Sequence, residues 1–191
     1  MKPILVLGAT GFIGGQIALA AAGRGWPVRA TRRRPGSVGA LAGVAIDWVQ
    51  ADLEDASSLE SAMRGCGAVF HAAAGYPQDF RHIPAEVARA EAEIRRVLDA
   101  ARRARVDAFV YTSSLSTAAA WRAGEGPGRL LDERDFYVPG SARSAYYEAK
   151  LAMERIVLAE RELPTQALLP TAVFGPGDVK PTTGLVLREA A

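Results

Sequence analysis

Short apolar runs alternate along the chain with longer segments in which apolar and polar residues recur at helical spacing. The runs are predicted as strands, and they cover residues 4–7, 28–31, 46–49, 68–70, 108–111 and 165–169. Helices are predicted from the turn after the first run to about residue 24, and over residues 59–64, 85–104 and 145–160. In the third helix, the predicted buried stripe consists of Val87, Ile94, Val97 and Leu98.

This regular alternation of strand and helix predicts the fold class. Parallel strands need long crossover connections, which helices usually supply. We therefore expect an α/β protein with a doubly wound, mainly parallel sheet covered by helices on both faces. No internal repeat, low-complexity tract or linker divides the sequence, so residues 1–191 are predicted to form a single domain.

The composition narrows the class of protein without pointing to a partner. Apolar residues make up 49% and charged residues 23%, as in ordinary globular domains. The net charge is only +2 and the arginines are scattered, so we expect no nucleic-acid partner. The single cysteine, Cys66, can form no intrachain disulfide and suggests no metal site. No apolar stretch approaches the ~18 residues of a membrane span, and we expect a cytoplasmic protein.

A glycine-rich turn, Gly-Ala-Thr-Gly-Phe-Ile-Gly at residues 8–14, follows the first predicted strand and opens the first predicted helix. In this context glycines allow a tight turn and close approach of the backbone to a pyrophosphate, and the helix N-terminus attracts the negative charge. A tight turn without a ligand is the alternative. We predict a Rossmann-type dinucleotide site whose first residues are Gly8, Thr10, Gly11, Phe12, Ile13 and Gly14.

Two arginines at the end of the second predicted strand indicate which dinucleotide is bound. An acidic residue that holds the adenosine ribose usually lies about 20 residues or slightly more after the glycine motif. Arg32 and Arg33 occupy this region, and no acid is nearby. A guanidinium can bind a 2′-phosphate that a carboxylate would repel. The sequence therefore favours NADP over NAD, unless these arginines only solvate a loop.

Tyr146 and Lys150 lie four residues apart in a predicted helix and would share one face. A phenol has an ordinary pKa of about 10, and a neighbouring ammonium would lower that pKa toward the neutral range. The pair is therefore a candidate for proton transfer, although the same spacing is common on exposed helices. The neighbouring Tyr147 has Leu151 in place of a base four residues later.

Taken together, these motifs resemble the extended short-chain dehydrogenase/reductase family, also called the NAD-dependent epimerase/dehydratase family. The resemblance covers essentially the whole chain. It rests on residues 8–14, Asp52-Leu53, residues 71–74, residues 109–114, Tyr146 with Lys150, Pro170 and residues 174–178. Residues 111–114, the Asp132-Glu133 region and residues 175–182 look most like the dihydroflavonol-reductase-like branch.

The resemblance implies a role for each matching residue. Asp52 and Leu53 would hold the adenine, and Ala72, Ala73 and Ala74 would line the cofactor cleft. Ser114, with Ser113 as its competitor, would hydrogen-bond the reacting oxygen. Tyr146 would transfer the proton, and Lys150 would bind the nicotinamide ribose. The remaining cofactor residues would be Pro170 and Val173. Two structural alternatives stay open, in which His71 is a buried histidine and Asp52 a helix cap.

The expected function is NADPH-dependent reduction of a carbonyl, with a small-molecule substrate carrying a carbonyl or a secondary alcohol. A nucleotide-sugar epimerase or dehydratase and a non-catalytic dinucleotide sensor are the alternatives, and a homodimer is left open. The chain departs from the family at Ala90, Glu93-Ile94 and Leu169. It also stops soon after the sixth predicted strand, so we expect that the C-terminal portion that shapes the substrate pocket is absent and that this chain alone shows little or no turnover.

Overall fold

The computed structural model describes residues 1–73, 82–118, 132 and 135–178. Its strands are β1 (Ile4–Leu7), β2 (Val28–Arg32), β3 (Asp47–Gln50), β4 (Ala68–His71), β5 (Ala108–Thr112) and β6 (Thr165–Leu168). Its helices are α1 (Phe12–Gly23), α2 (Ala56–Met63), α3 (Ile83–Ala104) and α4 (Ala145–Ala159), with short 3₁₀ turns η1 (Gly39–Leu41) and η2 (Leu115–Thr117).

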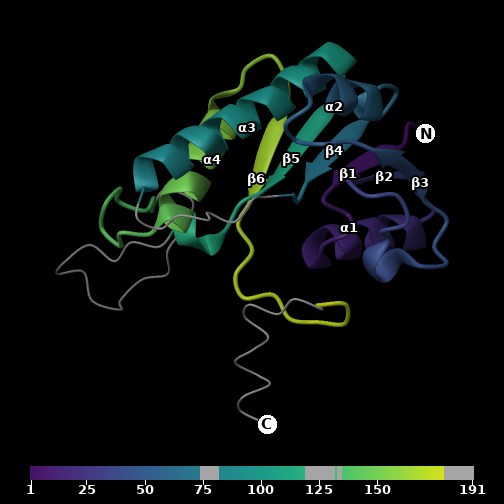
Figure 1. Cartoon of the computed structure of the whole chain (residues 1–191), viewed down its shortest axis with the longest axis horizontal. Coiled ribbons are helices and arrows are strands. Elements are labelled where there is room, and N and C mark those ends of the chain that lie inside the picture. Colours follow the sequence, from purple (N-terminus) through teal and green to yellow (C-terminus); the bar gives the residue numbers. More distant parts are fainter. Residues whose placement is uncertain (74–81, 119–131, 133–134, 179–191) are drawn as a thin grey trace, which may run out of the picture.

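The six strands form one sheet in the order β3-β2-β1-β4-β5-β6, and each neighbouring pair is parallel (Figure 1). The chain order reverses between β1 and β4, where Leu7 pairs with His71. In open parallel sheets a crevice forms beyond the carboxyl ends of the strands at such a reversal. The fold therefore places the end of β1, with its glycine turn, beside the end of β4, and β5 follows as the next strand.

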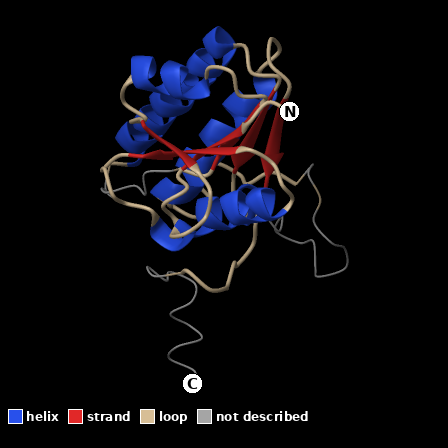
Figure 2. Cartoon of the chain, turned by 90° about the vertical axis from the view of Figure 1, so that its right-hand side faces the viewer, coloured by secondary structure: helices blue, strands red, loops and turns tan. Residues whose placement is uncertain are grey.

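Helices cover both faces of the sheet, as Figure 2 shows. On one face α1 and η1 pack on β1 and β2 around Val6, Ala18, Ala30 and Leu41. On the other face α2, α3 and α4 enclose the larger core, which contains buried side chains from these helices and from β1, β4 and β5. This arrangement confirms the predicted doubly wound α/β class. No helix within the described part of the chain is long and apolar enough to cross a membrane.

The observed elements lie within three residues of the predicted ones. α2 begins at Ala56 because the side chain of Asp55 caps it, accepting from the N–H groups of Ser57 and Ser58. Strand β3 is shifted by one residue, to Asp47–Gln50, from the predicted 46–49. One predicted core residue was wrong. Val87 is only half-buried, because it lines an open groove between α3 and α4.

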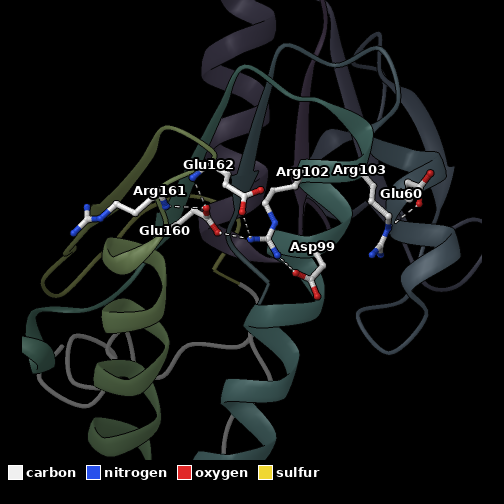
Figure 3. A network of polar contacts seen from close by, with 7 residues as sticks. All are labelled: Glu60, Asp99, Arg102, Arg103, Glu160, Arg161 and Glu162. Carbon is white, nitrogen blue, oxygen red and sulfur yellow. Dashed lines mark hydrogen bonds and ion pairs between the residues drawn. The ribbon is translucent and has the colours of Figure 1, made fainter.

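Ion pairs join the carboxyl end of α3 to its two neighbours (Figure 3). Arg102 contacts Asp99 on its own helix, and it donates to Glu160 just after α4 at 3.3 Å. Glu160 also accepts from the N–H groups of the following turn, which leads into β6. On the other side Arg103 donates to Glu60 of α2 at 3.0 Å. The network fixes α3 between α2 and α4 at the end of the molecule remote from the crevice.

Candidate functional site

The glycine turn occupies the crevice end of β1 in a shape that side chains would block. Gly8 has a φ of +85°, and a Cβ there would lie 2.6 Å from the nitrogen of Ala73, which follows β4. A Cβ on Gly14 would meet the carbonyl of Gly8. The turn thus lies directly against the segment after β4, and both glycines are required by close packing.

The first turn of α1 fits a phosphate ligand. Gly11 caps the helix without a side-chain hydrogen bond, and the first turn carries no acidic residue. Gly11 is also exposed. The N–H groups at this end and the partial positive charge of the helix therefore face the crevice without a competing side-chain cap or carboxylate in that turn. The residues present fit the pyrophosphate of a dinucleotide.

Arg32 ends β2 and is held over an aromatic ring. Its guanidinium carbon lies 5.4 Å from the ring centroid of Trp48 on the neighbouring strand β3. Such cation–π contacts hold a guanidinium while leaving its N–H groups free to bind an anion. Arg33 is exposed, and its carbonyl accepts from Gln50 at 3.3 Å. Trp48 was not singled out from the sequence, because its contact with Arg32 forms only when β2 and β3 pair.

Asp52 and Leu53 follow β3 at the same edge of the sheet. Asp52 accepts from the N–H of Glu54 at 3.0 Å, and its own N–H donates to Ser58 at 3.1 Å. The alternative that Asp52 caps the next helix is wrong, because Asp55 does so. The carbonyl of Leu53 accepts from Arg96 of α3 at 2.9 Å. These bonds fix a small loop at the carboxyl end of β3, two strands away from β1 in the sheet.

The segment after β4 completes this part of the crevice. The N–H of Ala72 donates to the carbonyl of Leu7 at 3.0 Å, so Ala72 and Ala73 run alongside the glycine turn. Ala74 lies outside the described residues. His71 is fully buried against the rings of Phe109 and Tyr111, which confirms the expectation of a buried histidine.

The two serines after β5 have different surroundings. Ser113 is buried and donates to the carboxylate of Glu154 on α4. Ser114 is half-buried, lies directly before η2 as its N-cap, and accepts from the N–H of Ser116 at 3.2 Å. In this arrangement the Ser114 hydroxyl can still donate its hydrogen outward. The difference supports Ser114 over Ser113 as the serine that would contact a ligand.

Lys150 enters the site from α4, one turn after Tyr146. Its ammonium donates to the carbonyl of Thr112 at 3.0 Å and to the hydroxyl of Tyr111 at 3.3 Å. Tyr146 is half-buried, and its ring lies edge-on to that of Tyr147 at a centroid distance of 6.2 Å. The structure therefore brings the Lys150 ammonium to the carboxyl end of β5, two residues before Ser114, with Tyr146 one helical turn earlier on α4.

Burial controls the charges at this point. It lowers the pKa of Lys150 to about 8, against the opposing effects of Glu93 and Glu154. Burial, with a smaller contribution from the Lys150 charge, lowers the pKa of His71 to about 3, so this ring is neutral at pH 7. Burial likewise raises the pKa of Tyr111, which therefore stays protonated. At neutral pH, Lys150 is the cation of this group.

Sequence reasoning missed the supporting residues Tyr111 and Glu154. Glu154 lies one turn after Lys150 and is 2% exposed. An acid at this spacing within the Tyr-Lys helix was the available signal, because a buried carboxylate on a core face needs polar partners. Those partners, Ser113 and Thr117, come from a segment about 40 residues earlier in the chain, which no local pattern can identify.

The segment after β6 returns across the edge of the sheet toward α1 (Figure 1). The carbonyl of Pro170 accepts from the N–H of Leu115 at 3.0 Å, which places Pro170 beside Ser114. Further along, Gln16 of α1 donates to the carbonyl of Pro176 at 2.9 Å. Val173 lies between these two points and is half-buried. The segment therefore connects the serine turn with the glycine turn.

Comparison with known proteins gives a consistent picture. The model of the family described as NAD dependent epimerase/dehydratase matches residues 4–189. A Synechocystis protein provisionally named dihydroflavonol 4-reductase is 31% identical over 187 residues, covering 96% of this chain and 53% of that protein. The dihydroflavonol 4-reductase of Zea mays is 29% identical over 194 residues, covering 91% of this chain and 53% of that protein.

Among solved structures, a nucleoside-diphosphate-sugar epimerase from Pseudomonas aeruginosa superposes with a TM-score of 0.78 at 28% identity. The match covers 97% of this chain and 57% of that one. The chain spans about half the length of the curated relatives it matches.

Proposed function

The chain belongs to the NAD dependent epimerase/dehydratase family, and on that premise we propose that it binds NADP and reduces a substrate carbonyl through Ser114, Tyr146 and Lys150. The observation that carries this proposal is the buried ammonium of Lys150, 3.0 Å from the Thr112 carbonyl and one helical turn from Tyr146. The bound cofactor would supply the hydride. The membership agrees with the motifs, including those of the dihydroflavonol-reductase-like branch.

The protein's own residues would bind the cofactor along the crevice. Residues 8–14 and the N-terminus of α1 would hold the pyrophosphate, and Asp52 with Leu53 the adenine. Ala72, Ala73 and Ala74 would line the cleft, with Pro170 and Val173 opposite them. Support for this arrangement comes from the contact of the glycine turn with Ala73 and from the uncapped first turn of α1.

The reduction needs a proton as well as a hydride. Ser114 would donate a hydrogen bond to the substrate oxygen, and Tyr146 would give that oxygen its proton. Lys150, fixed by Thr112, would stabilise the phenolate that Tyr146 leaves behind. With its pKa lowered to about 8, this ammonium would still be mostly charged at neutral pH and would lose its charge in alkali.

The preference for NADP rests on Arg32. Its guanidinium is supported by the face of Trp48, and its charge suits a 2′-phosphate. Arg33 is exposed next to it and would add a second contact.

A nucleotide-sugar epimerase is the second candidate, favoured by the similarity to the Pseudomonas aeruginosa epimerase at 28% identity. The same serine, tyrosine and lysine could serve a sugar hydroxyl, with the hydride returned to the same substrate. The two functions differ in net redox change, because an epimerase leaves the cofactor unchanged overall.

One assay separates these functions. NADPH absorbance is followed with a panel of aldehydes, ketones and dihydroflavonol-like compounds, and nucleotide sugars are monitored in parallel by NMR. We expect a loss of NADPH that depends on a carbonyl compound. Sugar interconversion without net NADPH loss would replace the proposal by the epimerase, and failure to bind either NADPH or NADH by calorimetry would contradict both.

A further inference from the structure

The carboxylate of Glu154 is enclosed in the protein, although it belongs to none of the groups assigned to the reaction. It lies on α4 one turn beyond Lys150 and two turns beyond Tyr146, and it is 2% exposed. A buried carboxylate is costly unless hydrogen bonds compensate for its lost hydration. Its partners lie on another segment. Ser113 donates to its Oε2 atom, and the hydroxyl of Thr117 lies 2.6 Å from the same atom.

These two partners flank Ser114. Ser113 is the residue before it, while Thr117 approaches its carbonyl through both the backbone N–H, at 3.0 Å, and the side-chain hydroxyl, at 2.9 Å. The single hydrogen of the Thr117 hydroxyl is shared between the Ser114 carbonyl and Glu154. The carboxylate therefore holds the turn on both sides of Ser114.

We propose that Glu154 is a positioning residue, which fixes the Ser114 turn relative to Tyr146 and Lys150 through the hydroxyls of Ser113 and Thr117. The physical reason is that one helix, α4, carries the side chains of Tyr146, Lys150 and Glu154. Because Glu154 is anchored on α4, its bonds to the turn set the separation between that helix and Ser114. The effect of this positioning on catalysis rests on the proposed function. The clamp itself, which is the contact of Glu154 with the hydroxyls of Ser113 and Thr117, does not depend on it.

The charges around Lys150 agree with this role. Glu93 on α3 and Glu154 on α4 both raise its pKa against the effect of burial. Among the described residues, the ammonium also contacts the carbonyl of Thr112 and the hydroxyl of Tyr111, and its charge acts on the neutral ring of His71. Glu93 and Glu154 thus both stabilise the Lys150 charge. Among the described contacts, however, the hydroxyls of Ser113 and Thr117 donate to Glu154 and not to Glu93. This difference provides a matched control.

Hydrogen exchange of the Leu115 and Thr117 amides tests the clamp in the chain as it is. These amides donate to Pro170 and Ser114, so their exchange reports opening of the turn. We expect Glu154→Gln and Ser113→Ala each to speed exchange roughly tenfold, the loss expected for a hydrogen bond to a charged group. The double variant should exceed Glu154→Gln only slightly, because the change at Glu154 already disturbs its contact with Ser113 as well as that with Thr117.

Two controls sharpen the comparison. Ser113→Thr keeps the hydroxyl and should restore slow exchange, and Glu93→Gln should leave exchange at these amides unchanged. Wild-type exchange rates in both Glu154→Gln and Ser113→Ala would overturn the clamp. If a change at the buried Glu154 prevents folding, the comparison of Ser113→Ala with Ser113→Thr still decides the test.

Turnover tests the positioning role. In the NADPH assay, we expect Ser113→Ala to lower kcat roughly tenfold with the KM for NADPH unchanged, and Ser113→Thr to recover most of the loss. Faster exchange with unchanged kcat would reduce Glu154 to a structural support and overturn its positioning role. Absence of both turnover and NADPH binding in the wild-type protein would contradict the proposed function, and the exchange rates would then still decide whether Glu154 holds the turn.

Discussion

At the scale of single residues, the charge at the end of β2 is expected to decide which dinucleotide binds. Arg32→Asp replaces the cation over Trp48 with an anion that would repel a 2′-phosphate and accept from ribose hydroxyls. We expect the preference for NADPH to reverse, with about 1–3 kcal/mol at stake for the lost charged hydrogen bonds. Calorimetric titration with both reduced cofactors measures the change.

The same substitution at the exposed Arg34 is the control for this experiment, since it alters the net charge equally without touching Trp48. It should leave the preference for NADPH in place. Equal affinity of the wild-type protein for NADH and NADPH would show that Arg32 does not select the phosphorylated cofactor.

Tyr146 and Tyr147 are adjacent on α4 and form a matched pair for testing proton transfer. In a longer, active form of the protein, Tyr146→Phe removes the proposed proton donor and should lower turnover by roughly 10² to 10⁴, while NADPH affinity changes little. Tyr147 packs edge-on against Tyr137 at a ring-centroid distance of 5.5 Å, a contact that Tyr147→Phe preserves. Steady-state kinetics of the two variants compare the roles, and an equal loss in both would count against Tyr146.

At the scale of elements, helix α1 depends on close approach of its first turn to β1. A Cβ at Gly14 would lie 2.7 Å from the carbonyl carbon of Gly8, and backbone cannot give way there cheaply. We expect Gly14→Ala to lower the free energy of unfolding by roughly 1–3 kcal/mol and to weaken NADPH binding. Urea denaturation and calorimetry measure the two effects.

Gly23, at the other end of the same helix, is the control. A Cβ there meets nothing within 4 Å, so Gly23→Ala should be neutral or stabilising by about 0.5–1 kcal/mol through its helix propensity. If both substitutions had the same effect on stability, the close contact between α1 and β1 would not be the cause.

At the scale of the whole molecule, the buried His71 makes stability depend on pH. Its pKa is about 3 when folded and about 6.5 when unfolded, so between these values the unfolded chain binds more protons. The stability associated with the neutral ring is complete above pH 6.5 and is lost as the pH falls toward 3. We expect His71→Phe to reduce the loss of unfolding free energy between pH 7 and pH 4 by a few kcal/mol, on the order of what the pKa shift allows.

Urea denaturation of the wild-type and His71→Phe proteins at these two pH values gives the comparison. Lys150 does not interfere, because its lowered pKa of about 8 makes stability rise with pH only between about 8 and 10.5. An unchanged slope in His71→Phe would show that the ring is hydrated in solution.

The sequence by itself determined the class of fold and the order of its elements. Apolar runs and helical spacing are local properties of the chain, so they predicted all six strands and the four main helices, with boundaries that differ by up to three residues. The largest difference, at the start of α2, came from a cap at Asp55 rather than from hydrophobic spacing. The glycine turn and the pair Tyr146 and Lys150 were also visible, because each is a short motif within one element or turn.

Only the tertiary structure decided which distant side chains meet. The support of Arg32 by Trp48 requires β2 and β3 to pair, and the anchoring of Lys150 by Thr112 requires α4 to pack at the end of β5. The contact of Glu154 with Ser113 spans 41 residues of sequence. Burial, which lowers the pKa values of His71 and Lys150, is likewise a property of the assembled core. Local patterns carry no information on such contacts, because the sheet order and helix packing that create them are set by the chain as a whole.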